Sequence, residues 1–74
     1  MIRRIKIEVG QVWIWTRKTE DPLEFTVTRI VDTNGYLNAM GMCLGKEVPF
    51  LALDKDGTAE LLTNWSLANP KLSG

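Results

Sequence analysis

The chain alternates apolar and polar side chains over short stretches, which is the period of strands with one buried face. Between residues 5 and 9 isoleucine and valine alternate with lysine and glutamate. Gly10-Gln11 then interrupts the pattern before a second run, Val12 to Thr16. A glycine at such a point favours a bulge or a bend. The pattern predicts a first strand over residues 5–16 with a bulge or a bend at Gly10.

A hairpin is predicted in the middle of the chain. The run Phe25–Val31 is dense in β-branched residues, which are stiff at χ1 and favour strands over helices. Asn34-Gly35 follows, and this dipeptide supplies the positive φ values that a two-residue hairpin turn requires. We therefore expect Phe25–Val31 and Tyr36–Cys43 to pair as antiparallel strands.

The last third of the chain predicts shorter elements. Val48–Leu53 forms a fourth strand, with Pro49 near its start because proline cannot donate to an interior ladder. The turn residues 54–57 come next, and Thr58–Leu62 is either a fifth strand or a helical turn, because periodicity cannot decide five residues. Residues 63–67 form a short turn or a closing strand.

Short groups of turn-forming residues recur roughly every 11–14 residues, a spacing typical of an all-β barrel or sandwich. They fall at residues 20–22, 34–35, 45–46, 56–57 and 69–70. With 74 residues and no repeat or linker, the chain has room for one hydrophobic core. We predict a single domain over residues 1–74, with an ordered core over about residues 5–68 and a tail over 69–74.

Part of the chain resembles a known family. Val9-Gly10-Gln11-Val12-Trp13, the run Phe25 to Ile30 and a late Trp65 resemble the opening, second strand and end of small Src-homology-3-like (SH3-like) barrel proteins of phages and other mobile elements. The likeness covers residues 7–67. It implies an all-β, five-stranded SH3-like barrel, and it assigns no site residues. The alternative of a short helical turn near the C-terminus is left open.

Composition and charge narrow the class of protein. A hydrophobic content of 45%, a charged content of 24% and a net charge of zero are typical of a folded globular domain. No apolar run is long enough to span a bilayer, and the interrupted apolar character of the first residues argues against a signal peptide, so we expect a cytoplasmic protein. Residues 1–20 carry five basic and two acidic side chains, and residues 21–74 carry four basic and seven acidic ones. The chain is thus expected to be a charge dipole.

The chemistry available to the chain is sparse. Histidine is absent and Cys43 is the single cysteine, in an apolar, methionine-rich setting that favours a buried thiol. Asp54-Lys55-Asp56-Gly57-Thr58 starts like a calcium loop, but Ala59 and Trp65 occupy the positions of the required glycine and bidentate glutamate. We therefore predict no enzyme activity, no cofactor, no metal site and no internal disulfide.

Two tryptophans mark the candidate binding surface. Trp13 and Trp15 are two residues apart and so lie on the same face of one strand. If Val12 and Ile14 fill the interior, both indoles face outward or lie under the N-terminal segment. In a core this small large aromatic side chains often close the ends of the barrel instead, so the pattern leaves the exposure of both indoles open. The candidate surface consists of the tryptophans and their basic neighbours: Trp13, Trp15, Arg3, Arg4, Lys6, Arg17 and Lys18.

Three functions are consistent with this surface. Tryptophan and arginine dominate protein interfaces, so the leading prediction is a non-catalytic protein-binding module, as in a phage or mobile-element accessory protein that modulates a larger host machine. Indoles flanked by cations also suit single-stranded nucleic acid, and a weak nucleic-acid-binding barrel is the second prediction. The third is a structural homo-oligomer that buries the indole face between copies.

Overall fold

The computed structural model describes residues 2–69, which form seven strands in two antiparallel sheets and contain no helix. The all-β prediction is confirmed. The strands are β1 (Arg3–Lys6), β2 (Val12–Trp15), β3 (Leu23–Thr33), β4 (Tyr36–Cys43), β5 (Lys46–Leu53), β6 (Thr58–Leu61) and β7 (Trp65–Leu67). Seven strands replace the predicted five because Gly10, with φ of 96°, separates β1 from β2, and residues 65–67 form a strand of their own.

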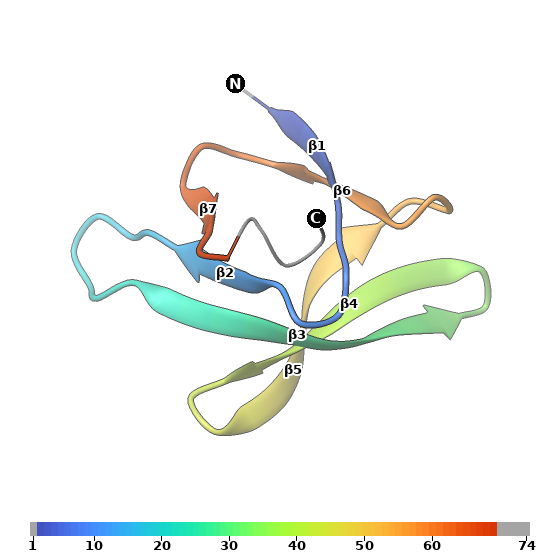
Figure 1. The fold of residues 1–74 in the computed structure, drawn as a ribbon, viewed down its shortest axis with the longest axis horizontal. Coiled ribbons are helices and arrows are strands. Elements are labelled where there is room, and N and C mark those ends of the chain that lie inside the picture. The colour runs from blue at the N-terminus through green and yellow to red at the C-terminus, as the bar shows by residue number, and fades with distance from the viewer. Residues whose placement is uncertain (1, 70–74) are drawn as a thin grey trace.

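The larger sheet has the strand order β5-β4-β3-β2-β7, and the smaller sheet pairs β1 with β6. The long β3–β4 hairpin extends to one side, and the β1–β6 pair lies above it in the view of Figure 1. β3 has 11 residues and pairs with β2 through its first half and with β4 through its second. The register shifts between Val27 and Arg29, so a bulge bends the strand as it passes from one neighbour to the other.

The predicted central hairpin is confirmed. Thr33 pairs with Tyr36, and the two residues between them, Asn34 and Gly35, have φ values of 53° and 87°. The Asp32 side chain accepts a hydrogen bond from the Gly35 N–H at 2.9 Å, which closes the turn. The local sequence alone therefore determines both the turn type and the register of β3 against β4.

The segment after β5 forms a second predicted turn. The backbone N–H of Asp54 donates to the Thr58 carbonyl at 2.9 Å, and Gly57 takes a φ of 79°. The chain then enters β6, which pairs with β1 in the register Ile5 to Ala59. Of the two alternatives left open for Thr58–Leu62, the strand is correct.

The two edges of the larger sheet are β5 and β7. Pro49 is exposed on β5, opposite Met40, where the β4–β5 register shifts. The missing N–H of proline therefore falls at a sheet edge and beside an irregularity, as expected for a strand proline.

The hydrophobic core lies between the two sheets. The larger sheet contributes Trp13, Val27 and Ala39, while Ala59 and Leu61 of β6 and Ile7 after β1 close it from the other side. These side chains are aliphatic apart from one indole. Within residues 2–69 there is no helix with the length and apolar character needed to cross a membrane.

The C-terminal end of the described chain is fixed to β2. Asn69, the first residue of the predicted tail, accepts a hydrogen bond from the Val12 N–H at 2.8 Å and donates one to the Gly10 carbonyl at 3.0 Å. The remaining positions of the predicted tail, residues 70–74, lie outside the described residues.

Candidate functional site

Trp13 does not contribute to a surface. Its side chain is fully buried in the hydrophobic core, with 0% exposure, whereas Val12 and Ile14 are only half-buried. Of the alternatives left open for the two indoles, the buried one is correct for Trp13. β2 carries apolar side chains on both faces, so alternation placed Trp13 and Trp15 on one face but could not identify that face as the inner one.

A buried glutamine holds the Trp13 indole in place. Gln11 is 3% exposed, and its Oε1 accepts hydrogen bonds from the Trp13 Nε1 at 3.1 Å and from the Glu8 N–H at 2.9 Å. Its Nε2 donates to the Lys6 carbonyl at 3.2 Å. One side chain thus satisfies the polar edge of the core tryptophan and fixes the turn between β1 and β2.

Trp15 lies at the end of β2 and is only half-buried. Its indole stacks on that of Trp65 across the β2–β7 pair, with ring centroids 5.9 Å apart and planes at 15°. Phe25 and Phe50 stack beside them at 4.8 Å and 9°, and both phenyl rings contact the Trp65 ring at a tilt. Four rings from β2, β3, β5 and β7 therefore form one cluster at the end of the core.

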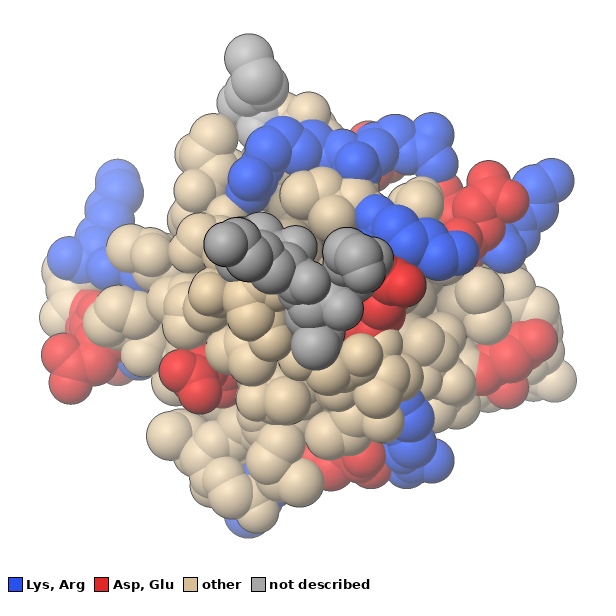
Figure 2. Space-filling model, in the orientation of Figure 1, with Lys and Arg blue, Asp and Glu red and all other residues tan. Residues whose placement is uncertain are grey.

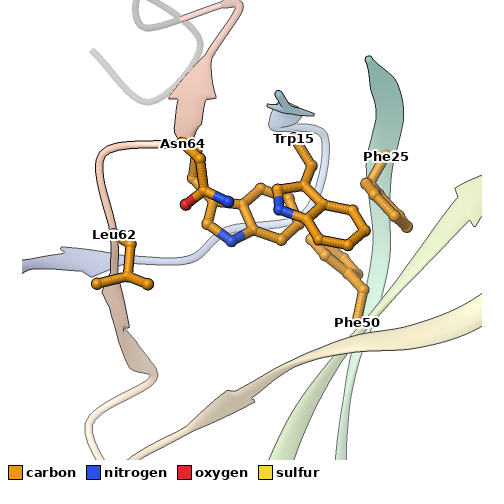
Figure 3. Close-up of a pocket in the computed structure, with 6 residues that line it drawn as sticks. Trp15, Phe25, Phe50, Leu62 and Asn64 are labelled. Carbon is orange, nitrogen blue, oxygen red and sulfur yellow. The ribbon is translucent and has the colours of Figure 1, made fainter. Parts of the chain in front are cut away.

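This cluster lines an open hollow of about 410 Å³, which we call the aromatic groove. Its walls are Trp15, Phe25, Phe50, Leu62, Asn64 and Trp65. Figure 3 shows Leu62 and Asn64 on one side of the Trp15 ring and Phe25 on the other. An apolar concavity with few polar groups has the character of a binding site for an apolar or planar group.

Asn64 supplies the polar feature of the aromatic groove. Its side-chain oxygen is buried and has no hydrogen-bond partner among the described residues. The Asn64 backbone carbonyl accepts from the Thr16 N–H at 2.8 Å, which anchors the segment before β7 to the end of β2. A buried acceptor without a donor costs free energy.

A second hollow, of about 530 Å³, opens next to the aromatic groove and shares Trp15, Leu62 and Asn64 with it. We call it the basic hollow, since its remaining walls are Thr16, Arg17, Lys18 and Thr63. Arg17 donates to the Asp21 carbonyl at 2.5 and 3.0 Å and to the Glu20 carboxylate at 3.2 Å. Lys18 is exposed and has no such bond within the described residues.

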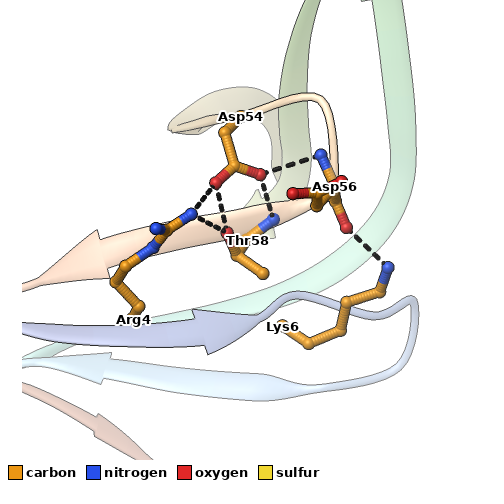
Figure 4. Close-up of polar contacts among 5 residues, drawn as sticks. All are labelled: Arg4, Lys6, Asp54, Asp56 and Thr58. Atoms are coloured by element: carbon orange, nitrogen blue, oxygen red, sulfur yellow. Dashed lines mark hydrogen bonds and ion pairs between the residues drawn. The ribbon is translucent and has the colours of Figure 1, made fainter.

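The basic side chains of β1 are separate from these hollows and are occupied by neighbouring groups. Arg4 forms an ion pair with Asp54, and the Lys6 Nζ donates to the Asp56 carbonyl at 2.7 Å (Figure 4). Arg3 donates to the Trp65 carbonyl at 2.5 Å. Pairing β1 with β6 therefore places basic side chains of residues 1–20 against the acidic turn at residues 54–57, and Figure 2 shows blue and red side chains next to one another.

Asp54 is the centre of that charged turn. The Thr58 hydroxyl donates to its Oδ2 at 2.5 Å, and the Thr58 and Asp56 N–H groups donate to its Oδ1 at 3.1 and 2.9 Å. These bonds, led by the Thr58 hydroxyl and assisted by Arg4, hold the pKa of Asp54 well below its ordinary value. The arrangement explains the calcium-like sequence here as a capped turn.

A further charged cluster crosses three strands of the larger sheet. The Arg29 guanidinium on β3 donates to both oxygens of Glu47 on β5, at 2.8 to 3.2 Å, and the Thr28 hydroxyl donates to the same carboxylate at 2.7 Å. The hydrogen bond from Arg29 lowers the pKa of Glu47. This cluster lies over the β3 bulge and connects β3 to β5 across β4.

Reactive and metal-binding groups are few in the described part of the chain. Cys43 is half-buried at the end of β4, where the sequence favoured a fully buried thiol. Among residues 2–69 no three cysteine or carboxylate side chains lie close enough together to hold a metal ion.

Of the seven predicted site residues, the structure brings Trp15, Arg17 and Lys18 together and places Trp13 in the core and Arg3, Arg4 and Lys6 on β1. Five residues of the aromatic groove were missed: Phe25, Phe50, Leu62, Asn64 and Trp65. They come from distant parts of the chain. The only signal in the sequence was that three of them, Phe25, Phe50 and Trp65, are aromatic.

Comparison with protein-family models, with curated proteins and with solved structures finds no match to this chain. Inference about its function therefore rests on its own geometry.

Proposed function

We propose that the chain is a non-catalytic protein-binding module that uses the aromatic groove to hold a segment of a larger partner. The observation that carries the proposal is the open cluster of four rings at the end of the core, formed by Trp15, Phe25, Phe50 and Trp65. Aromatic side chains are enriched at protein interfaces and supply most hot spots, because a rigid ring contributes a large contact area at a small entropic cost. Leu62, which is 57% exposed, extends the apolar surface at the rim.

The architecture we propose for this module is a small SH3-like barrel. Its support is the antiparallel order β5-β4-β3-β2-β7 and a long, bulged β3 that pairs with β2 at one end and β4 at the other. The β1–β6 pair then covers the side of the core that the larger sheet leaves open. A phage or mobile-element accessory protein in the cytoplasm, acting on a larger host machine, is the biological setting that this proposal retains from the sequence resemblance.

The second prediction, a weak nucleic-acid-binding barrel, has less support in the structure than a protein-binding module. Affinity for nucleic acid comes mainly from cations that neutralise phosphates. Arg4 is paired with Asp54, Lys6 and Arg3 donate to carbonyls, and Arg17 is bonded within its own loop. The homo-oligomer that buries both indoles between copies would need an exposed Trp13, and Trp13 is in the core. Self-association through another surface stays a prediction.

The experiment is an affinity capture from host lysate with tagged full-length chain, followed by mass spectrometry and by reconstitution with the purified partner. Trp15→Ala and Leu62→Glu test the aromatic groove, and Leu44→Glu is the matched control. Leu44 is 87% exposed and lies in the β4–β5 turn, outside both hollows. The proposal expects one partner that wild type and L44E retain and both groove variants lose. A partner that all four proteins retain equally would show that the groove is not the binding surface.

A further inference from the structure

The aromatic groove and the basic hollow form one continuous surface, and together they specify the chemistry of an occupant. They share Trp15, Leu62 and Asn64, so a ligand that fills one has its neighbouring atoms in the other. The shared wall lies between the end of β2 and the segment that joins β6 to β7. A single extended segment of a partner can therefore contact both.

The charges along this surface have one sign. Arg17 and Lys18 line the basic hollow, and none of the residues that line either hollow is acidic. Glu20 lies in the same loop but is bonded to Arg17 rather than directed into a hollow. Lys18 is exposed and has no partner in the described chain, so its ammonium group is available to a ligand. Complementarity therefore favours negative charge next to the group that enters the aromatic groove.

The aromatic groove adds a second requirement, which concerns the group that enters it. The Asn64 side-chain oxygen on its wall is buried and out of reach of a ligand, so the four rings determine what the groove accepts. The four rings favour an aromatic anchor, because rings stack or tilt on one another at centroid distances of about 4.5–7 Å.

We infer that the partner presents an extended acidic segment with one aromatic side chain, resting on the proposed protein-binding function. The aromatic ring enters the groove, and a carboxylate next to it in the peptide faces Lys18, the one cation of the basic hollow that has no partner within the described residues. A nucleobase also stacks on aromatic rings, but a run of phosphates needs several free cations, whereas one carboxylate needs one. Nucleic acid is accordingly an outcome of the test.

The test measures binding of synthetic probes to the full chain by calorimetry. The probes are a glycine–serine peptide with one phenylalanine flanked by aspartates, the same peptide with lysines for the aspartates, the same with alanine for the phenylalanine, and oligothymidylate. We expect the acidic aromatic peptide to bind at least about tenfold more tightly than either peptide control at low salt. The preference over the lysine peptide should shrink as salt is raised, since surface charges are screened.

Two variants separate the parts of the inference. Lys18→Glu changes an exposed side chain and should reverse the preference between aspartate and lysine peptides. Leu62→Glu places a carboxylate on the wall that both hollows share and should weaken the acidic peptide at least about tenfold, whereas Leu44→Glu, outside both hollows, should leave its affinity unchanged. Equal affinity of wild type and Leu62→Glu would show that the peptide binds elsewhere.

Each remaining outcome counts against the inference in a different way. Equal binding of aspartate and lysine peptides would overturn the acidic specificity, while the groove would stand as a peptide site. Binding of oligothymidylate alone would favour nucleic acid. If no peptide binds and yet a lysate partner depends on Leu62, the inference fails and the proposed function survives. If neither is seen, both fail.

Discussion

The Phe50 ring lies directly over Gly41, so closely that a Cβ at position 41 would be 2.6 Å from Phe50 Cε1 and 3.2 Å from the Thr26 carbonyl oxygen. β4 has to carry glycine here for Phe50 of β5 to reach across and stack on Phe25. The aromatic groove thus depends on a residue that does not line it.

Gly41→Ala should destabilise the protein by about 1–3 kcal/mol, the usual cost of overpacking a core. Urea unfolding followed by tryptophan fluorescence measures the change. Phe50→Leu and the double variant complete a thermodynamic cycle, in which the smaller side chain should relieve most of the cost of the alanine. A double variant whose loss equals the sum of the single losses would contradict the predicted clash.

Gln11→Met should be among the most damaging single substitutions. The apolar side chain keeps the size of glutamine but leaves the Trp13 Nε1 and the Glu8 N–H without their acceptor. Leaving each donor unsatisfied costs about 1–3 kcal/mol, and a core of this size supplies roughly 3–5 kcal/mol in total. We expect a largely unfolded chain by circular dichroism. Glu60→Met, on the exposed face of β6, introduces the same side chain and should fold normally.

The β4–β5 turn carries a removable strain. Leu44 and Gly45 have φ values of 53° and 80°, nearly the same as Asn34 and Gly35 in the other hairpin. Leucine is disfavoured in the left-handed region, and at 87% exposure Leu44 packs on little. Leu44→Asn should therefore stabilise the protein by about 1 kcal/mol, and the reciprocal Asn34→Leu should destabilise it by a similar amount. Equal thermal midpoints for wild type, Leu44→Asn and Asn34→Leu would show that leucine in the left-handed region does not strain the turn.

Stability should fall in acid partly through Asp54. Its pKa is lowered in the folded state from an ordinary value of 3.8, so the unfolded chain binds the proton first as the pH decreases. The stabilisation is complete above that ordinary value and is lost as the pH falls toward the folded-state pKa. Urea midpoints measured from neutral pH downward should decline less for Asp54→Asn than for wild type. Parallel profiles would show that the Thr58 and Arg4 contacts do not favour the ionised carboxylate.

The sequence predicted those parts of the fold that local chemistry determines. Asn34-Gly35 specified a turn and its register, and Pro49 marked a strand at a sheet edge. It did not predict which face of β2 is buried, since Val12 and Trp13 are both apolar and only their neighbours in space distinguish them. For the same reason the rings at positions 15, 25, 50 and 65 could not be joined into one site, because β2, β3, β5 and β7 meet only after the sheet forms.

The pairing of β1 with β6 has a consequence for how the chain reaches its native state. Arg3 bonds to a residue 62 positions away, so this contact closes nearly the whole chain into a loop. Contacts of such sequence separation form late, because the entropy of closing the loop is lost before they contribute stability. The hairpins of β3, β4 and β5 are local and can assemble first, because an isolated hairpin forms in about 1–10 microseconds. The core that contains Trp13 is then completed only when the two ends of the chain meet, and until that moment the nascent protein exposes to water the largest side chain that its folded core buries completely.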